Sequence, residues 1–408
     1  MGHSLKFRMT RVSAYRFEDA RALVIERVRA LRAAPRTEMV GLLDAAGRVL
    51  MEEVRADRDL PPVARSVRDG FAVQSASLPG TLHVVGEVRA GGSFAGEVRP
   101  GEAVEIMTGA PVPRGAYQIV MVEHVERDGD RIMTARTGKP GEFINAAGSE
   151  SKAGDVVVAA GTRMDFVHIA ALAMVGATQA RVFRRPKVAI LSTGDEVIPV
   201  EQKPTDSQVR NSNAWSLAAQ VKRAGGDPVL LPAVADDEAA TRRAIEEGLK
   251  QDLLLLSGGV SAGKYDYVEP ALAALGAEFY FDRVLIQPGQ PLVFGRARER
   301  FFFGLPGNPA STMATFELFG RAALELLGGA NEAPLPLLSA RLTREFRHKP
   351  GLTRFLPARL GEDGQSVEPL PWAGSSDVAA LARGNAYLVV EAEREAYAAG
   401  EWIKVIPR

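Results

Sequence analysis

Between residues 186 and 330, short apolar segments of strand type alternate with segments of helix type, and this alternation constrains the fold more than any other feature. The strand-type segments cover 187–193, 228–234, 252–259 and 301–309. The helix-type segments cover 213–226, 236–250, 266–276 and 310–329. Such alternation is typical of a parallel α/β sheet, and ligands bind these sheets beyond the carboxyl ends of the strands. We therefore predict an α/β domain with a site at that edge.

The flanking regions have other patterns. A helix is predicted over 16–33, because apolar residues recur there at steps of three and four. From about 36 to 185, short alternating runs separated by Gly and Pro predict antiparallel strands with tight turns, with one short helix over 167–177. After 332 we expect short strands around a helix over 376–384. The fold class is therefore multidomain, α/β plus β.

The composition excludes several classes of protein. The 408 residues include no cysteine, which excludes disulfides, thiolate zinc sites and iron–sulfur clusters. There are 50 basic and 50 acidic residues, and this balance argues against a nucleic-acid binder. The longest mostly apolar stretch, 167–180, is too short to cross a bilayer, and the first ten residues lack an apolar signal region. We expect a cytoplasmic protein with no membrane partner.

Three loops follow strands of the predicted sheet and carry unusual chemistry. The segment SGGVSAGKYDY (257–267) contains glycines that can expose backbone N–H groups to an anion. It is not an NTPase P-loop, since Tyr265 stands where that motif needs Ser or Thr. The segment LPGNPAS (305–311) precedes a helix whose N-terminus would also face an anion. Ordinary strand-to-helix turns that need only Gly and Pro remain the alternative for both.

Acidic residues gather after the same strands. They are Asp195 and Glu196 in STGDEV (192–197), Asp236 and Asp237 at one helix start, and Asp266 at another. Oxygen ligands of this kind suit Mg²⁺, which keeps waters and bridges to phosphate. Helix capping is the alternative for the aspartates, and a Thr193–Glu196 capping box is the alternative for Glu196.

Seven motifs together resemble the molybdopterin molybdenumtransferase family, MoeA, whose relatives include the gephyrin E domain. They are GRVL (47–50), VRDGFAV (67–73), IMTGAPVP (106–113), LSTGDEV (191–197), SGGVSAGKYDY, IQPGQPL (286–292) and LPGNPAS. The resemblance implies a homodimer of four-domain chains. The implied domains are an α/β molybdopterin-binding domain (1–34 and 186–331), a β-rich linker domain (35–56 and 148–185), an inserted β-rich domain (57–147) and a C-terminal β-barrel-like domain (332–408).

The resemblance also implies the reaction and its residues. Molybdate is inserted into adenylylated molybdopterin, AMP leaves, and Mg²⁺ assists; a molybdopterin adenylyltransferase and molybdoenzymes are the implied protein partners. The implied catalytic residues are Asp69, Thr108, Glu196, Asp236 and Asp266. The implied metal ligands are Asp195, Glu196, Asp236 and Asp266. The implied substrate-binding residues are Ser257, Gly258, Gly259, Ser261, Lys264, Arg283, Gln287, Pro306, Asn308, Pro309, Arg354 and Ser375.

Two motifs depart from the family pattern. Around the first, many members read Asn-Ser-Ala-Met-Asp-Gly, where this chain reads RSVRDG (65–70). Where many members carry lysines before and within Pro-Gly-Lys-Pro, this chain has Gln287 and Gln290, which carry no charge to bind an anion. A non-catalytic binder or carrier of adenylylated molybdopterin or of the finished cofactor is therefore the alternative function. A gephyrin-like scaffold and a nucleotide pyrophosphatase are weaker alternatives.

Overall fold

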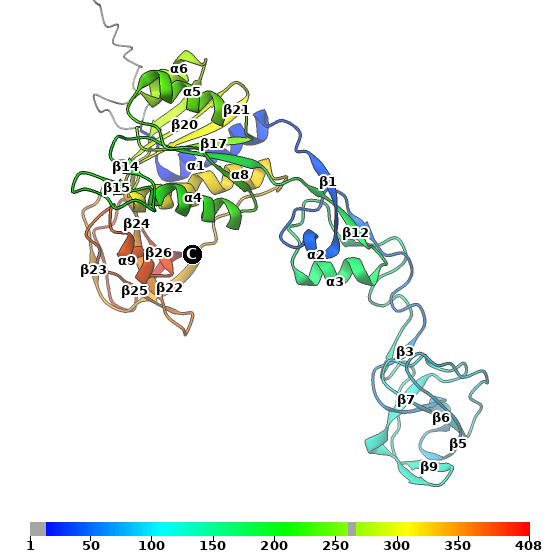
Figure 1. Ribbon diagram of the computed structural model, residues 1–408. Coiled ribbons are helices and arrows are strands. Elements are labelled where there is room, and N and C mark those ends of the chain that lie inside the picture. Colours follow the sequence, from blue (N-terminus) through cyan, green and yellow to red (C-terminus); the bar gives the residue numbers. More distant parts are fainter. Residues whose placement is uncertain (1–13, 260–266) are drawn as a thin grey trace, which may run out of the picture. The chain divides into compact units, whose positions relative to one another are not determined.

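The computed structural model describes residues 14–259 and 267–408, and the chain divides into two compact units. The first unit contains the residues up to 39, 47–51 and 181–408; the second contains 40–46 and 52–180. Strands β1 (Thr37–Gly41) and β12 (Gln179–Phe183) pair where the chain passes between the units (Figure 1). None of the described helices is long and apolar enough to span a membrane.

A six-stranded sheet forms the centre of the first unit. Its order is β16 (Asp227–Leu230), β13 (Lys187–Ser192), β17 (Leu253–Ser257), β21 (Arg300–Leu305), β20 (Pro291–Ala297) and β18 (Glu278–Arg283). The first four strands are parallel, which confirms the α/β prediction, whereas β20 and β18 add an antiparallel edge. The sequence analysis did not predict this edge. No helix lies between β18, β20 and β21, so these strands do not follow the alternation of strand and helix on which the prediction was based.

Helices cover both faces of this sheet. One apolar cluster joins alternate strand residues such as Ile190 and Leu255 to α1 (Phe17–Leu31), α4 (Ser212–Arg223), α7 (Pro309–Thr315) and α8 (Arg321–Leu327). The other joins the intervening residues, such as Leu191 and Leu254, to α5 (Glu238–Gly248) and α6 (Val268–Ala274). The central strands are apolar on both faces because their side chains alternate between two buried layers.

The C-terminal part of the first unit is a closed barrel, as the resemblance implied. Its ring runs β24 (Thr353–Leu360), β25 (Ser366–Pro369), β22 (Leu338–Leu342), β28 (Trp402–Pro407) and β26 (Ala386–Val390), which pairs again with β24. The short strand β19 (Ile286–Gln287) pairs with β24. The pair β23 (Phe346–Arg347) and β27 (Ala396–Tyr397) and helix α9 (Val378–Arg383) also belong to this part. The short strands β14 (Val197–Ile198) and β15 (Val209–Arg210) pair with each other and lie between β13 and α4 in the chain.

The second unit is rich in short strands. Its main sheet has the order β7 (Gln118–Met121), β4 (Gly70–Val73), β6 (Glu102–Ile106), β5 (Gly80–Val88), β9 (Arg131–Thr134) and β8 (Glu126–Asp128). It is antiparallel as predicted, except that β5 and β6 are parallel. The remaining elements are α2 (Leu42–Ala45), β2 (Val54–Arg55), β3 (Arg65–Ser66), β10 (Ile144–Asn145), β11 (Val156–Val158), α3 (Phe166–Met174) and two 3₁₀ turns (Ser75–Ser77 and Val122–His124).

A buried carboxylate lies where α7 continues into α8. A π-helical turn (Phe316–Gly320) links the two helices, and its Glu317 is 2% exposed. The carboxylate pairs with Arg223 of α4 at 2.6 Å and with Arg321 of α8 at 3.1 Å. A buried charge is tolerated only when it is paired. The two ion pairs of Glu317 satisfy this condition, and they link α4 to α8 on the same face of the sheet.

Replacing Glu317 should therefore destabilise the first unit. We expect Glu317→Ala to cost about 3 kcal/mol and to lower the melting temperature by roughly 6–10 °C in differential scanning calorimetry, since Arg223 loses its carboxylate partner and Arg321 keeps only Glu325 among the described carboxylates. The matched control is Glu247→Gln, which removes only an exposed ion pair with Lys250 and should leave the melting temperature unchanged. Equal melting temperatures for Glu317→Ala and the unsubstituted chain would contradict this account.

Candidate functional site

A cleft of about 810 Å³ lies at the carboxyl ends of the parallel strands in the first unit. Strands β13, β17 and β21 end at the same level, because Ser192 lies opposite Ser257 and Ser257 lies opposite Leu305. The three predicted loops leave from these ends, and described residues of all three line the cleft. The expectation that the fold brings these loops together is confirmed.

Gly258 allows two of these loops to approach closely. Its φ is +91°, and a Cβ there would lie 2.7 Å from the carbonyl oxygen of Thr193. The Thr193 N–H donates to the Ser257 carbonyl at 3.1 Å, and the Gly258 N–H donates to the Leu305 carbonyl at 3.3 Å. A side chain at 258 would separate the loops, so this glycine is needed for the shape of the cleft.

Carboxylates form one side of the cleft. Glu196 and Asp236 line it, and the Asp236 N–H donates to Oδ1 of Asp195 at 3.0 Å. Partial burial, together with the negative charges of Asp195 and Glu196, raises the pKa of Asp236. No helix follows Thr193, because the chain continues into β14, so the capping-box alternative for Glu196 is wrong. Asp237 does cap α5, since its Oδ1 accepts from the Ala240 N–H at 2.6 Å.

This carboxylate group fits a divalent cation in part. Its mutual repulsion would be relieved by a positive ion, and Mg²⁺ in proteins usually needs only one or two carboxylates besides water and phosphate. Within residues 14–259 and 267–408, however, no three His, Asp or Glu side chains gather closely enough to hold an ion. The fourth predicted ligand, Asp266, lies outside the described residues, as do Ser261 and Lys264.

The turn that begins α4 supplies cleft residues that the sequence analysis missed. Oδ1 of Asn211 caps the helix by accepting from the Ala214 N–H at 3.1 Å. Nδ2 of Asn213 donates to Oγ of Ser257 at 2.8 Å and to the Gly307 carbonyl at 2.7 Å. The sequence signal was the Asn-Ser-Asn run (211–213), which reads as an ordinary helix start.

The proline loop connects the cleft to the C-terminal barrel. Pro306, Asn308 and Pro309 line the cleft. Nδ2 of Asn308 donates to Oγ of Ser375 at 2.8 Å, and the Ala310 N–H donates to the Ser375 carbonyl at 2.9 Å. Two predicted binding residues, Asn308 and Ser375, are thus in direct contact although 67 positions separate them.

Other predicted binding residues lie on the strands that join barrel and sheet. Gln287 on β19 lies opposite Arg354 on β24. One terminal nitrogen of Arg354 donates to the Lys349 carbonyl at 3.1 Å, and Arg283 is exposed at the end of β18. Arg283, Gln287 and Arg354 are not among the residues that line the cleft.

The remaining two predicted catalytic residues contact each other in the second unit. Oδ1 of Asp69 accepts from the Thr108 N–H at 2.6 Å and from its hydroxyl at 2.7 Å. These bonds lower the pKa of Asp69, so its carboxylate stays charged at neutral pH. These hydrogen bonds join the VRDGFAV and IMTGAPVP turns, a contact that the sequence analysis did not predict.

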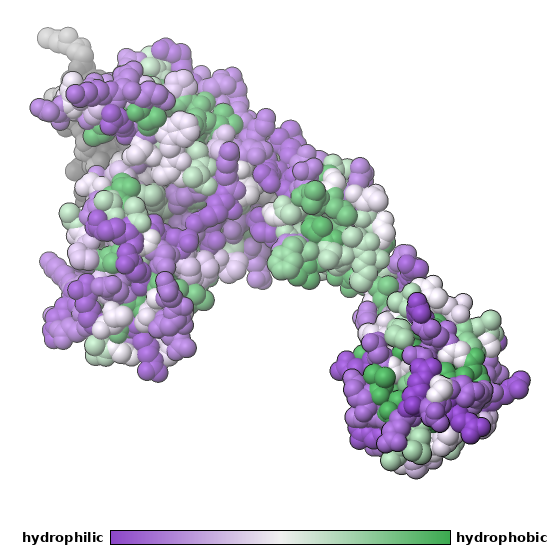
Figure 2. All heavy atoms as spheres, turned by 60° about the horizontal axis from the view of Figure 1, so that its bottom comes forward, coloured by the Kyte–Doolittle hydropathy of each residue, from purple (hydrophilic) through white to green (hydrophobic). Residues whose placement is uncertain are grey.

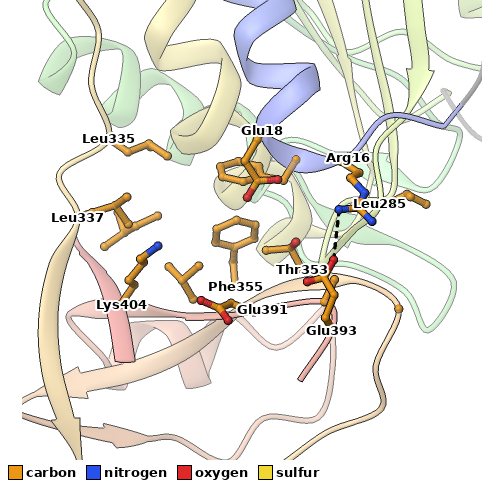
Figure 3. A pocket seen from close by; sticks show the side chains of 15 residues that line it. Arg16, Glu18, Leu285, Leu335, Leu337, Thr353, Phe355, Glu391, Glu393 and Lys404 are labelled. Atoms are coloured by element: carbon orange, nitrogen blue, oxygen red, sulfur yellow. Dashed lines mark ion pairs between the residues drawn. The ribbon is translucent and has the colours of Figure 1, made fainter. Parts of the chain in front are cut away.

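A second, more apolar cleft of about 510 Å³ lies between α1 and the barrel (Figure 3). Phe355, Leu335 and Leu337 are among its apolar lining, and Arg16 forms an ion pair with Glu393 at its edge. None of the sequence-predicted site residues lines it.

Comparisons with known proteins cover nearly the whole chain. Residues 15–176 match the family model of the MoeA N-terminal region (domain I and II), 189–326 match a probable molybdopterin binding domain, and 339–408 match the MoeA C-terminal region (domain IV). The molybdopterin molybdenumtransferase of a Nostoc strain is 35% identical over 344 residues, which cover 82% of this chain and 79% of that protein. The chain belongs to the molybdopterin molybdenumtransferase family.

Other relatives extend this similarity over the full length. The molybdopterin molybdenumtransferase of Haemophilus influenzae is 31% identical over 398 residues, covering 96% of this chain and 98% of that one. The crystal structure of the MoeA protein of Pyrococcus horikoshii OT3 aligns with a TM-score of 0.82 and 28% identity, covering 97% of this chain and 100% of that one. The resemblance drawn from the seven motifs is confirmed, and the chain is a member of an enzyme family of molybdenum cofactor biosynthesis.

The raised pKa of Asp236 leads to a prediction about pH. Because folding raises this pKa above its unfolded value, ionisation of Asp236 opposes folding at high pH and has no effect once the group is protonated in both states. Asp236→Asn should therefore melt at a higher temperature than the unsubstituted chain at pH 7–8. This difference should shrink as the pH falls through the raised pKa of Asp236 and vanish below about pH 4.

Melting curves recorded from pH 4 to 8 by circular dichroism check this prediction. The control is Asp237→Asn, which keeps a good N-cap and leaves Asp195, Glu196 and Asp236 in place, so it should not reproduce the higher melting temperature of Asp236→Asn at pH 8. A lower melting temperature for Asp236→Asn at pH 8 would contradict the repulsion described here.

Proposed function

We propose that this chain inserts molybdate into adenylylated molybdopterin and releases AMP, with Mg²⁺ as the assisting metal. The observation that carries the proposal is the cleft in the first unit, where the three motif loops of the family come together beside a carboxylate group. The relatives support the proposal, because they are named molybdopterin molybdenumtransferases and the chain aligns with them over most of their length.

The cleft offers separate groups for the metal and for the anions of this substrate. We assign Asp195, Glu196 and Asp236, with Asp266, to Mg²⁺, which when bound neutralises charge on the phosphoanhydride oxygens and eases departure of AMP. Ser257, Gly258 and Gly259 are assigned to the phosphate and pterin, where a hydroxyl and backbone N–H groups bind anionic oxygens.

Asn308 and Ser375, which contact each other, are assigned to the molybdate side together with Pro306, Pro309, Arg354 and Gln287. An amide and a hydroxyl orient an oxyanion by hydrogen bonds, and a guanidinium adds charge and bidentate contact. We assign a catalytic role to Asp69 and Thr108. We assign a role in substrate binding to Ser261, Lys264 and Arg283.

Product analysis tests the reaction directly. Purified protein incubated with adenylylated molybdopterin should release AMP, measured by chromatography, only when molybdate and Mg²⁺ are both present. Asp266→Ala should abolish this release while the circular dichroism spectrum stays unchanged. Molybdate-independent release, or full activity of Asp266→Ala, would contradict the proposed reaction or the metal assignment respectively.

Gln287 and Gln290 favour the second candidate, a carrier that binds adenylylated molybdopterin without releasing AMP. Binding without AMP release in the unsubstituted chain would select this candidate. Restoration of release by Gln287→Lys with Gln290→Lys would then show that the missing charges are the cause. Molybdate-dependent release by the unsubstituted chain would exclude the carrier.

We also propose that the chain is a homodimer, and the surface of the second unit supports this. Helix α3 exposes apolar residues along one side, including Phe166 at 82%, Val167 at 58% and Met174 at 49%, and Leu43 of α2 is 90% exposed. Helices α2 and α3 contact each other, and Figure 2 shows the apolar surface in their region. An apolar patch of this kind is typical of protein interfaces.

Placing a charge on this surface should weaken the dimer. We expect Phe166→Glu to shift the mass measured by light scattering from dimer toward monomer, with dissociation at concentrations about tenfold higher than for the unsubstituted chain. Met133→Glu, an exposed apolar position on β9 of the same unit, is the control and should leave the dimer intact. A stable dimer of Phe166→Glu would place the interface elsewhere.

A further inference from the structure

Two asparagines at the start of α4 bind the serines that end the neighbouring strands β13 and β17, and they do so with opposite hydrogen-bond direction. Ser192 ends β13 and Ser257 ends β17, and they lie opposite each other in the sheet. Oγ of Ser192 donates to Oδ1 of Asn211 at 3.0 Å, whereas Oγ of Ser257 accepts from Nδ2 of Asn213 at 2.8 Å. The proton of Ser192 is therefore used within the protein, and that of Ser257 points elsewhere.

The chemistry of the partners fixes these polarities. Oδ1 of Asn211 also accepts from the Ala214 N–H, so the atom facing Ser192 is an oxygen. Nδ2 of Asn213 lies 2.7 Å from the carbonyl oxygen of Gly307, which can only accept, so the amide group facing Ser257 is the NH₂. A hydroxyl that accepts this bond keeps its own proton for another acceptor.

We propose that Asn213 is a positioning residue of the cleft, which fixes the Ser257 hydroxyl as a donor toward an anionic oxygen of the substrate and ties the loop after Ser257 to the loop at Gly307. This inference rests on the proposed function, since the anionic oxygen belongs to adenylylated molybdopterin. Among the described residues, no acceptor is found for the Ser257 hydroxyl proton, and both residues line the cleft.

Within residues 14–259 and 267–408, the Asn213 amide has a protein partner for its nitrogen but not for its oxygen. Oδ1 of Asn213 is buried and has no hydrogen-bond partner within the part of the chain that the structure describes. An unsatisfied buried acceptor lowers stability, and at Asn213 this feature coincides with a place in the cleft. Gln220, two turns further along α4, has the same pattern away from the cleft, because its Nε2 donates to the Met313 carbonyl at 3.0 Å and its Oε1 has no partner within the same described part.

Substitutions at position 213 should act through Ser257. Asn213→Ala removes the donor and leaves the Ser257 hydroxyl free to rotate. Asn213→Asp places an acceptor there, so the hydroxyl turns inward and its proton no longer points at the substrate. We expect kcat/KM for AMP release, or the affinity for adenylylated molybdopterin if the chain is a carrier, to fall about tenfold for Asn213→Ala and further for Asn213→Asp.

A double-mutant cycle with Ser257→Ala separates positioning from general destabilisation. In the Ser257→Ala background, Asn213→Ala and Asn213→Asp should have similar effects of about threefold or less, because the group that they control is gone. Gln220→Ala is the matched control: it should lower the melting temperature about as much as Asn213→Ala, leave kcat/KM unchanged and show no coupling to Ser257→Ala.

Each outcome of this cycle decides one question. Additive effects of the 213 and 257 substitutions, or an unchanged kcat/KM in Asn213→Ala, would overturn the positioning role while the proposed function stands. An unsubstituted chain that neither binds adenylylated molybdopterin nor releases AMP would overturn the proposed function, and the positioning role with it.

Discussion

The common register of β13, β17 and β21 is the constraint on which the site depends. Because Ser192, Ser257 and Leu305 lie side by side, the three loops that follow begin at one level and enclose a single cleft. Alternate side chains of these strands are buried in two different apolar layers. A slip by one residue would exchange the two layers, so packing on both faces fixes the register and thereby the position of every loop.

Two of the contacts that position the barrel lie at the ends of β19 and α7, and the second forms part of the site. Strand β19 leaves the sheet and pairs with β24, and the Ser375 backbone accepts from the first turn of α7. The hydrogen bond from Asn308 to Ser375 then places a barrel residue beside the proline loop. A shift of the barrel against the sheet would therefore alter the cleft, which explains why a domain far along the chain contributes to a site built on parallel strands.

Much of the first unit could be predicted from the sequence, because its signals are local. The alternation of strand and helix predicted four parallel strands and their helices, and the loops after those strands predicted the edge of the cleft. The antiparallel β18 and β20 carried no such signal, since their pairing depends on tertiary neighbours.

The sequence analysis missed Asn213 for a related reason. The side chain of Asn213 acts through its hydrogen bonds to Ser257 and Gly307, which are 44 and 94 positions away. The four-domain division, the metal ligands and the role of each site residue stay predictions.

On the proposed function, the two ends of the site use different physics. Near Asp236, three carboxylates repel one another and need a cation for balance, so binding there depends on charge. On the proposed molybdate side, Asn308 contacts Ser375, so an amide and a hydroxyl lie together, whereas Gln287 and Arg354 lie opposite each other outside the cleft lining. Neutral donors recognise the shape of an oxyanion more than its charge, and their contribution is screened little by salt. Gln287 and Gln290 carry no charge, so on the proposed function they add no attraction at a distance to the anion. The placement of the proline loop, and of Asn213 that donates to its Gly307 carbonyl, therefore decides how well the anion is held.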